Sequence, residues 1–529
     1  MTFKNPILPG FYPDPSVCRV GDDFYLVTST FAYFPGVPIF HSKDLVNWSQ
    51  IGNVLTRDSQ LPVKDAEVSR GIFAPTIRWH NGTFYMITTN VSGMGNFFVT
   101  ATDPAGPWSE PTVIKGAPGI DPSLFFEDGK CWYHGTCEKP DGKYFGDNDI
   151  YLQELCLETG QLVGERHVIW HCALRNAVWP EAPHIYKRGE WYYLLISEGG
   201  TGPDHAVTVA RSRTLTDYYE GYKSNPILTH RHLGQKYPIA NVGHGDLVET
   251  PNGEWWMVLL ASRPYGGYYR NLGRETYLTP VTWENDWPVV NYGVGLVLDE
   301  EKFPVLTPVP AVAPSPGMSQ TLDFTNTREF PIDMMHLRNP VQEDYVLSES
   351  GLRMRAAAGV IHGLNAVSYY CLRQQHMSFD VCIKMHFAPT ESEEAGIVVF
   401  QSHKYNYQFL LSLKNGEEVL RVVKCENEAL ETLAEVSLAS AFSENKNVAI
   451  CDKFIWLKIS ARGQLLSFSY STDGKVFIMA HENAPAHILS TDVAGGFVGN
   501  TIGMYATANG AESQNFATFE RLEYEEANG

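Results

Sequence analysis

The chain has 529 residues, which is too long for a single hydrophobic core, so two or more domains are expected. Hydrophobic residues make up 44% of the sequence and charged residues 19%, a balance that excludes a largely disordered protein. The 40 Lys and Arg residues against 60 Asp and Glu leave a net charge of −20, which opposes nucleic-acid binding and suits a neutral ligand.

The first residues, MTFKNPILPGFYPDPS, contain no apolar segment of the kind that forms a signal peptide. No run of 18 apolar residues follows, so we expect no membrane partner. The nine cysteines are odd in number and scattered, with no CxxC pair, which is typical of reduced thiols. We therefore expect a cytoplasmic protein. These patterns do not indicate an oligomeric state.

A polar turn that contains glycine, followed by an aromatic-rich strand, occurs five times in the first 262 residues. Each copy has the sequence pattern of a β-hairpin, a glycine turn next to β-branched and aromatic residues. Their spacing of about 45 to 65 residues is the length of one four-stranded blade, so five copies predict a five-bladed β-propeller. A chance meander of hairpins is the alternative. The copies are GDDFYLVTST, NGTFYMITTN, DGKCWYHGT, RGEWYYLLIS and NGEWWMVLLAS, with turn glycines Gly21, Gly82, Gly129, Gly189 and Gly253.

The strand before each turn glycine starts seven or eight residues earlier, and three of the five starting positions are acidic. The innermost strands of a propeller line a shared channel, so residues at matching positions meet at one end of that channel. The five positions are Asp14, Ala74, Asp121, Glu181 and Gly245, the last beside His244 and Asp246. The sequence therefore predicts that the three acids lie around one site.

Three carboxylates around one channel end repel each other, and like charges raise the pKa of at least one of them. Glycoside hydrolysis uses this arrangement, because it needs a protonated acid for the leaving oxygen and an ionised carboxylate for the water. Two alternatives stay open. The Asp-Pro-Ser segments at Asp14 and Asp121 also suit simple turn chemistry, and three acids from separate strands also suit a calcium cage.

Six segments in the first 300 residues resemble glycoside hydrolase family 43, and most closely its two-domain β-xylosidases and α-L-arabinofuranosidases. The resemblance implies a five-bladed propeller and hydrolysis with inversion, with no required cofactor. It implies that Asp14 is the general base, that Glu181 is the general acid, and that Asp121 raises the pKa of the acid and orients it. The segments are NPILPGFYPDPS, FAPTIRWHNGTFYMITTN, GIDPSLFF, WPEAPHIYK, VGHGDLV and GRETYLTPVTWENDWPV.

The same resemblance implies further contacts with the substrate. Arg274, in GRET, is expected to hydrogen-bond the terminal sugar, and Phe31 and Phe73 are expected to contact the substrate. Many relatives have Trp where this chain has Phe73, so the smaller ring alters the pocket wall. His244 matches a channel histidine that in some relatives approaches a bound calcium ion or its waters, and a plain structural histidine is the alternative.

The composition changes after residue 303. Five prolines within residues 304–316 predict a stiff linker over 304–317, between a catalytic propeller at 1–303 and a second domain at 318–529. The second domain alternates polar and apolar residues with period two, which predicts a β-sandwich. LDFTNT and STDGKVF resemble the C-terminal sandwich of the same hydrolases, in which a loop places an aromatic residue over the pocket. The matching segment, AGGFVGNTIGMY, makes Phe497 the candidate, and an ordinary core residue is the alternative.

The favoured function is an exo-acting, inverting glycosidase that removes terminal pentoses from xylo- and arabinoxylo-oligosaccharides. The sequence does not separate β-D-xylose from α-L-arabinofuranose as the preferred sugar. Two other functions are kept as alternatives. One is a non-catalytic sugar-binding propeller. The other is a fructan-cleaving hydrolase, although the Asn-Asp-Pro-Asn and Arg-Asp-Pro segments of those enzymes do not occur in this sequence.

Overall fold

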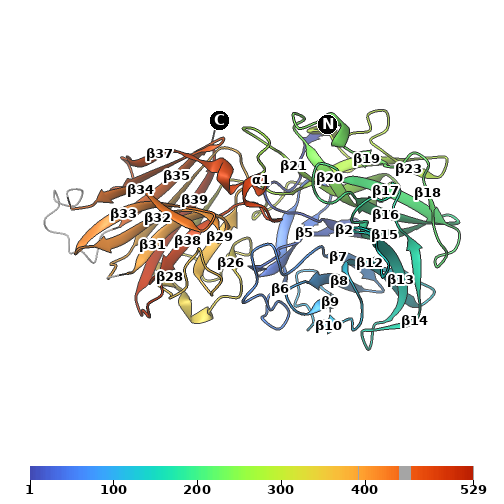
Figure 1. The fold of residues 1–529 in the computed structure, drawn as a ribbon, viewed down its shortest axis with the longest axis horizontal. Coiled ribbons are helices and arrows are strands. Elements are labelled where there is room, and N and C mark those ends of the chain that lie inside the picture. The colour runs from blue at the N-terminus through green and yellow to red at the C-terminus, as the bar shows by residue number, and fades with distance from the viewer. Residues whose placement is uncertain (391, 440–453, 528–529) are drawn as a thin grey trace.

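Five antiparallel sheets surround one axis in the N-terminal half of the protein. The structure is a computed structural model that describes residues 1–390, 392–439 and 454–527. In Figure 1 the propeller lies on the right and a β-sandwich on the left. The predicted fold, a five-bladed propeller followed by a β-sandwich, is confirmed. Within the described residues, no helix has the length and apolar character needed to cross a bilayer.

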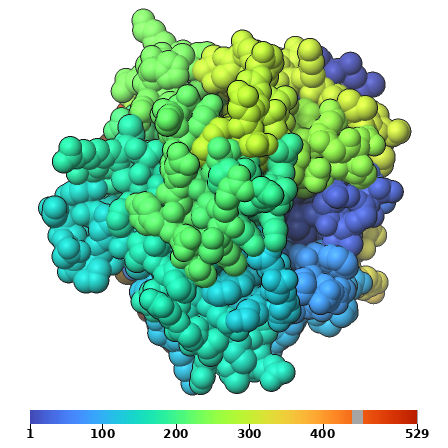
Figure 2. Space-filling view, turned by 90° about the vertical axis from the view of Figure 1, so that its right-hand side faces the viewer, coloured from blue at the N-terminus to red at the C-terminus, as the bar shows by residue number. Residues whose placement is uncertain are grey.

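Each sheet is one blade of four strands in chain order, and the fourth sheet carries a fifth short strand. Figure 2 views the propeller end, where the colour changes from blue through cyan and green to yellow around the rim as one blade follows another. The blades are β2 (Ser16–Val20), β3 (Asp23–Val27), β5 (Gly36–Ser42) and β6 (Ser49–Leu55); β7 (Thr76–His80), β8 (Thr83–Asn90), β9 (Gly95–Ala101) and β10 (Thr112–Val113); β11 (Ile120–Glu127), β12 (Lys130–Glu138), β13 (Asn148–Cys156) and β14 (Gln161–Trp170); β15 (Glu181–Arg188), β16 (Trp191–Glu198), β17 (Ala206–Ser212), β18 (Glu220–Gly221) and β19 (Leu228–Thr229); and β20 (Ala240–Glu249), β21 (Trp255–Ser262), β22 (Glu275–Glu284) and β23 (Trp287–Val290).

The five predicted turn glycines each lie between the first and second strands of a blade. All five have positive φ, a backbone region that glycine adopts without a steric penalty. The values are +63° for Gly21, +81° for Gly82, +74° for Gly129, +59° for Gly189 and +81° for Gly253. The local sequence therefore determines where each innermost strand turns back, and the acids sit at the opposite end of that strand.

The chain closes the propeller by running its N-terminal segment along the fifth blade. Strand β1 (Thr2–Lys4) pairs with β24 (Glu300–Lys302). The backbone N–H of Leu8 donates to the carbonyl of Thr276 at 3.2 Å, and that of Tyr12 donates to the carbonyl of Arg274 at 3.1 Å. This closure brings the start of the first blade, and with it Asp14, beside residues 260 positions later in the chain.

Two large sheets form the sandwich, and apolar side chains between them form its core. The period-two pattern is clear in β30, where every second side chain is buried. One sheet contains β25 (Gln320–Asp323), β27 (Tyr345–Ser348), β28 (Gly351–Arg355), β30 (Phe379–His386), β35 (Ile455–Arg462), β36 (Leu465–Ser471), β37 (Ile478–Pro485) and β39 (Phe516–Glu526). The other contains β26 (Met335–Leu337), β29 (Ser368–Arg373), β31 (Glu394–Ser402), β32 (Tyr405–Lys414), β33 (Glu417–Glu426), β34 (Ala429–Ser437), β38 (Thr501–Thr507) and β4 (Tyr33–Phe34) of the propeller.

The two domains share a core, because β4 of the propeller pairs with β26 of the sandwich. Phe11 and Tyr33 pack in one buried cluster with Leu337 and Tyr505. A fully buried arginine also crosses the boundary: Nε of Arg373 donates to the carbonyl of Phe11 at 2.9 Å. These contacts hold the sandwich in one position against the propeller.

The proline-rich segment 304–317 lies against the first blade. The backbone N–H of Val309 donates to Asp44 at 2.8 Å, and that of Val312 donates to the hydroxyl of Ser49 at 2.7 Å. The hydroxyl of Ser315 donates to the carbonyl of Trp48 at 2.7 Å. Hydrogen bonds therefore anchor the segment to the first blade at several points along its length, although many of its side chains are exposed.

Candidate active site

A cavity of about 390 Å³ lies at one end of the propeller channel, and loops from both domains line it. All eight residues that the sequence indicated lie in its wall: Asp14, Phe31, Phe73, Asp121, Glu181, His244, Arg274 and Phe497. Seven further residues complete the lining. Ala74 is one of the five matching strand positions expected at the channel end, and the other six were not predicted from the sequence: Arg70, Ile120, Phe145, Trp179, Gly200 and Thr201.

The backbone turns sharply where the polar residues enter the cavity. Asp14, Asp121, Ala182 and His244 all have positive φ, between +50° and +55°. The ladders of three innermost strands, β11, β15 and β20, shift register at these points. A β-bulge re-aims a side chain, and strained backbone is commonly found at functional sites. The bulges in β11 and β15 turn Asp121 and Glu181 toward the channel end, away from the regular alternation of the strand, whereas Asp14 lies just before β2, whose ladder is regular.

Asp14 is 4% exposed and is held at both carboxylate oxygens. Its Oδ1 accepts a hydrogen bond from Nη1 of Arg274 at 2.7 Å, and its Oδ2 accepts one from the hydroxyl of Ser29 at 2.6 Å. Burial raises the pKa of Asp14, but Arg274, His244 and the Ser29 hydrogen bond outweigh burial, so its pKa is lowered. This carboxylate is therefore ionised at neutral pH and can accept a proton.

Glu181 is in the opposite electrostatic environment. Burial raises its pKa, and the carboxylates of Asp121 and Asp14 raise it further, so the pKa lies well above the usual value. Burial also raises the pKa of Asp121, and Asp14 adds to the rise while His244 opposes it. Oδ2 of Asp121 accepts a hydrogen bond from the backbone N–H of Ala182 at 3.1 Å, next to Glu181. Asp14 is thus the carboxylate held in its ionised form, and Glu181 is the acid that retains its proton.

A second polar layer, which was not predicted from the sequence, lies directly beneath the acids. Asp246 is fully buried and accepts hydrogen bonds from the Ser16 hydroxyl at 2.7 Å, Nη1 of Arg78 at 2.8 Å and the Tyr186 hydroxyl at 2.5 Å. Nη2 of Arg78 also donates to Nδ1 of His184 at 2.9 Å. The buried charge of Asp246 is therefore paired and fully hydrogen-bonded, as a buried carboxylate must be.

The repeated Asp-Pro-Ser segments contribute to both the cavity and this layer. In each segment the aspartate enters the cavity, and the serine two residues later points into the layer beneath. Ser16 bonds Asp246, and the hydroxyl of Ser123 lies 3.2 Å from Nδ1 of His184. The signal that could have revealed the layer was therefore present, because the serine recurs with the aspartate at matching positions in two blades.

Three phenylalanines form one aromatic wall of the cavity. The rings of Phe31 and Phe497 are stacked, with centroids 6.1 Å apart, and Phe73 meets both rings edge-on, at 5.6 and 6.0 Å. The guanidinium group of Arg274 lies 5.7 Å from the Phe31 ring centroid and 5.6 Å from that of Phe497. Phe497 is 40% exposed, so it is not an ordinary core residue of the sandwich.

The loop that carries Phe497 is attached to the propeller at several points. The backbone N–H of Phe497 donates to the hydroxyl of Ser69 at 2.9 Å. Six residues after β37, the short helix α1 (Thr491–Ala494) begins, and Asp492 in this helix pairs with Arg270 of the propeller at 2.8 Å. Both side chains are mostly buried, so solvent screens this ion pair less than it screens a fully exposed one.

His244 lies at the floor of the cavity, with Nδ1 3.7 Å from Oδ1 of Asp14. In the ranges that the structure describes, no group of three or more His, Cys, Asp or Glu side chains is arranged to hold a metal ion. Both oxygens of Asp14 already accept hydrogen bonds, one of them from the positive Arg274. The side chains around His244 therefore do not form a carboxylate cage for calcium.

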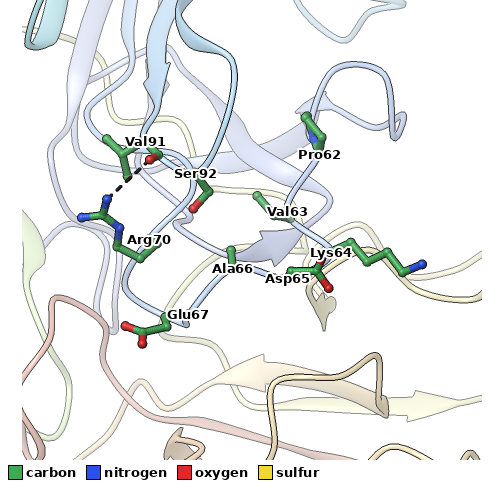
Figure 3. Close-up of a pocket in the computed structure, with 9 residues that line it drawn as sticks. All are labelled: Pro62, Val63, Lys64, Asp65, Ala66, Glu67, Arg70, Val91 and Ser92. Carbon is green, nitrogen blue, oxygen red and sulfur yellow. Dashed lines mark hydrogen bonds between the residues drawn. The ribbon is translucent and has the colours of Figure 1, made fainter.

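A second hollow, of about 440 Å³, opens between the segment that joins the first and second blades and the β8–β9 turn (Figure 3). Arg70 is the one residue it shares with the acidic cavity, and its guanidinium group reaches the carbonyl of Val91 at 3.5 Å. The carboxylates of this hollow, Asp65 and Glu67, are exposed to solvent. Solvent-exposed carboxylates without an opposing acid do not make a hydrolytic pair, so the chemistry is assigned to the acidic cavity.

Known proteins resemble this chain over its whole length. Residues 3–288 match the glycosyl hydrolases family 43, and residues 321–525 match the β-xylosidase C-terminal concanavalin A-like domain. A xylosidase/arabinosidase of Butyrivibrio fibrisolvens is 45% identical over 532 residues, covering 99% of both chains. A non-reducing end α-L-arabinofuranosidase of Bacteroides ovatus is 37% identical, covering 99% of this chain and 94% of that protein.

Solved structures agree with the sequence comparisons. The crystal structure of a xylan β-1,4-xylosidase from Bacillus halodurans superposes with a TM-score of 0.90 at 31% identity, covering 99% of this chain and 100% of the other. A family 43 protein from a xyloglucan utilisation locus of Bacteroides ovatus gives a TM-score of 0.90 at 36% identity, with complete coverage of both chains. The chain therefore belongs to glycosyl hydrolase family 43 and is a glycosidase.

Proposed function

We propose that this enzyme removes single pentose units from the non-reducing ends of xylo- and arabinoxylo-oligosaccharides, with inversion at the anomeric carbon. The observation that carries the proposal is the pairing of an ionised Asp14 with a protonated Glu181 in a cavity whose aromatic wall includes Phe497 of the second domain. A cavity closed at one end by such a wall accepts the end of an oligosaccharide and excludes its internal sugar units.

Each carboxyl group has one role in the proposed mechanism. Asp14 takes a proton from a water molecule, which attacks the anomeric carbon from the face opposite the leaving group. Glu181 donates its proton to the leaving oxygen. Asp121 holds the backbone next to Glu181 and raises the pKa of the acid through its own charge. Arg274 keeps Asp14 ionised, and we propose that the remaining donors of its guanidinium group bind the terminal sugar.

The names of the relatives support both pentoses as substrates, since they include xylosidases and an arabinofuranosidase. The terminal xylopyranose and arabinofuranose can place similar hydroxyl groups in one pocket. A net charge of −20 also suits neutral sugars, and we propose no nucleic-acid or membrane partner.

The test is a comparison of kcat/KM on nitrophenyl β-D-xyloside and nitrophenyl α-L-arabinofuranoside, with the anomer of the released sugar followed by NMR. We expect both substrates to be hydrolysed and the first-formed xylose to be the α-anomer. The absence of hydrolysis with both substrates would favour a sugar-binding propeller. Release of the β-anomer would overturn the inverting mechanism.

Phe497→Ala is expected to weaken kcat/KM for xylobiose while leaving the melting temperature nearly unchanged. The ring is 40% exposed and lies in a loop, whereas truncation of a fully buried phenylalanine costs about 3–5 kcal/mol. Phe409→Ala is the matched control, since Phe409 is completely buried in the sandwich core and its removal should lower the melting temperature strongly. A large drop in melting temperature for Phe497→Ala with unaltered kinetics would contradict the role in the pocket.

Hydrolysis in family 43 needs no cofactor. We expect dialysis against EDTA to change kcat/KM by less than twofold, because the carboxylates around the reacting centre need only protons and water. Calcium near His244 in the propeller channel stays a prediction. A loss of activity in EDTA that added Ca²⁺ restores, and Mg²⁺ does not, would establish a calcium requirement.

We also propose a cytoplasmic location and a division of the chain into a propeller at 1–303, a linker at 304–317 and a sandwich at 318–529. The eight cysteines among the described residues are unpaired, which supports a reducing compartment. Fractionation of the source cells, with xyloside hydrolysis followed in each fraction, tests the location.

The shared core around Tyr33 and Leu337 means that deletion of the sandwich also unfolds part of the propeller, so point variants test the site more cleanly.

A further inference from the structure

An aromatic ring stands almost free in solvent at the rim of the catalytic cavity. Phe145 lines the cavity, yet it is 78% exposed. Its ring meets the half-buried Trp179 edge-on, with centroids 5.4 Å apart and an interplanar angle of 89°. Phe145 and Trp179 are named the rim pair. Because Phe145 is mostly exposed, burial of its ring contributes little to folding, and the ring is open to a ligand at the edge of the cavity.

The indole of Trp179 is held between two backbone segments. A Cβ atom built on Gly146 would lie 2.8 Å from its Nε1, and one built on Gly200 would lie 2.6 Å from its Cε3. No side chain fits on either side of the ring. The backbone N–H of Trp179 donates to the carbonyl of Gly146 at 2.7 Å, and Trp179 itself has a φ of +47°. The ring is therefore fixed in place before any ligand arrives.

The loop that carries Phe145 is braced as well. The carboxylate of Asp147 pairs with Nζ of Lys139 at 2.6 Å and accepts the backbone N–H of Lys143 at 3.0 Å. The hydroxyl of Tyr144 donates to the carbonyl of Ala177 at 3.0 Å, near Trp179. An exposed ring on a braced loop loses little conformational entropy when a ligand packs on it, which is the basis of preorganised binding.

The position of the rim pair indicates which part of the substrate it meets. Trp179 lies two residues before Glu181, the proposed acid, which must reach the oxygen that leaves. The leaving sugar therefore extends from the acid toward this part of the rim. The other aromatic wall is formed by Phe31, Phe73 and Phe497. It lies against Arg274, and Arg274 pairs with Asp14, the proposed base. This wall is therefore available to the terminal pentose.

We propose that Phe145 and Trp179 form a stacking platform for the leaving-group sugar, and that this platform makes the enzyme prefer substrates whose leaving group is itself a sugar ring. The ligand class is a neutral pyranose that presents its C–H face to an aromatic ring. The proposal rests on the proposed function of the same cavity, and it assigns Phe145 to specificity, apart from the proton-transfer steps.

The experiment compares kcat/KM for xylobiose, which has a sugar leaving group, and for β-D-xylosyl fluoride, whose leaving group has no ring. We expect Phe145→Ala to lower kcat/KM for xylobiose on the order of tenfold, in line with the loss of one stacking partner. With the fluoride we expect a change of less than twofold. Phe145→Trp should restore xylobiose hydrolysis, since it returns an aromatic face to the same place.

Tyr292→Ala is the matched control, because Tyr292 is also a strongly exposed aromatic residue of the propeller, at 65%, and does not line the cavity. It should leave both substrates unaffected. Equal losses with both substrates for Phe145→Ala, or no loss with either, would overturn the platform. If the unaltered enzyme hydrolyses neither substrate, the proposed function itself fails, which is a distinct result.

Discussion

Glu181→Gln is expected to lower kcat for xylobiose on the order of 10²–10⁴-fold, because the amide keeps the shape of the acid and cannot donate its proton. The loss should be much smaller with β-D-xylosyl fluoride, since departing fluoride does not need full protonation. Steady-state kinetics on the two substrates measures the difference. Equal losses on both would refute the assignment of Glu181 as the acid.

The pH dependence provides a second measurement for the same variant. Burial and then the charges of Asp121 and Asp14 raise the pKa of Glu181, so the acid keeps its proton until the pH rises through that elevated value. The kcat/KM of the unaltered enzyme should fall on the alkaline side as this proton is lost. The unaltered enzyme should show this limb clearly with xylobiose and only weakly with the fluoride, and Glu181→Gln should show no such limb with the fluoride. Glu190→Gln, on the exposed turn of the same blade, is the matched control and should leave the profile unchanged.

Asp14→Asn is expected to lower turnover strongly with every leaving group, because each reaction needs an activated water molecule. A loss on the order of 10²–10⁴-fold is expected for a missing general base, and it should be the same for xylobiose and for the fluoride. This equal loss separates the base from the acid. Asp22→Asn, on the exposed turn of the first blade, is the control for the change in charge.

The low pKa of Asp14 sets the acidic limb of the activity profile. Burial raises this pKa, and Arg274, His244 and Ser29 lower it by more, so Asp14 stays ionised until the pH falls below the usual range of an aspartate. Activity should therefore be retained well into the acidic range. In a crystal structure the carboxyl groups of Asp14 and Glu181 should lie about 6.5–9.5 Å apart, which leaves room for the water. A separation near 5 Å would indicate a retaining nucleophile in place of a base.

Repetition made the fold and the three acids predictable from the sequence alone. Each turn glycine, such as Gly21, forms a tight turn that depends only on the few residues around it. The same turn and strand pattern recurs along the chain at a spacing that few folds produce. Because each acid lies seven or eight residues before its turn glycine, Asp14, Asp121 and Glu181 could be placed around one channel without any knowledge of contacts. The family resemblance then identified Arg274 and Phe497, whose segments carry no repeat of their own.

The tertiary structure alone decided which of these groups are charged and what surrounds them. Asp14 meets Arg274 across 260 residues, and Asp246 meets Arg78 across 168, through contacts that leave no periodic trace in the sequence. The directions of the pKa shifts depend on desolvation and on charges brought together by folding, so they could not be predicted from residue order. The rim pair was missed for the same reason. Phe145 and Trp179 belong to irregular loops of the third and fourth blades, and only the packing of Gly146 and Gly200 against the indole brings the two rings together at the acid.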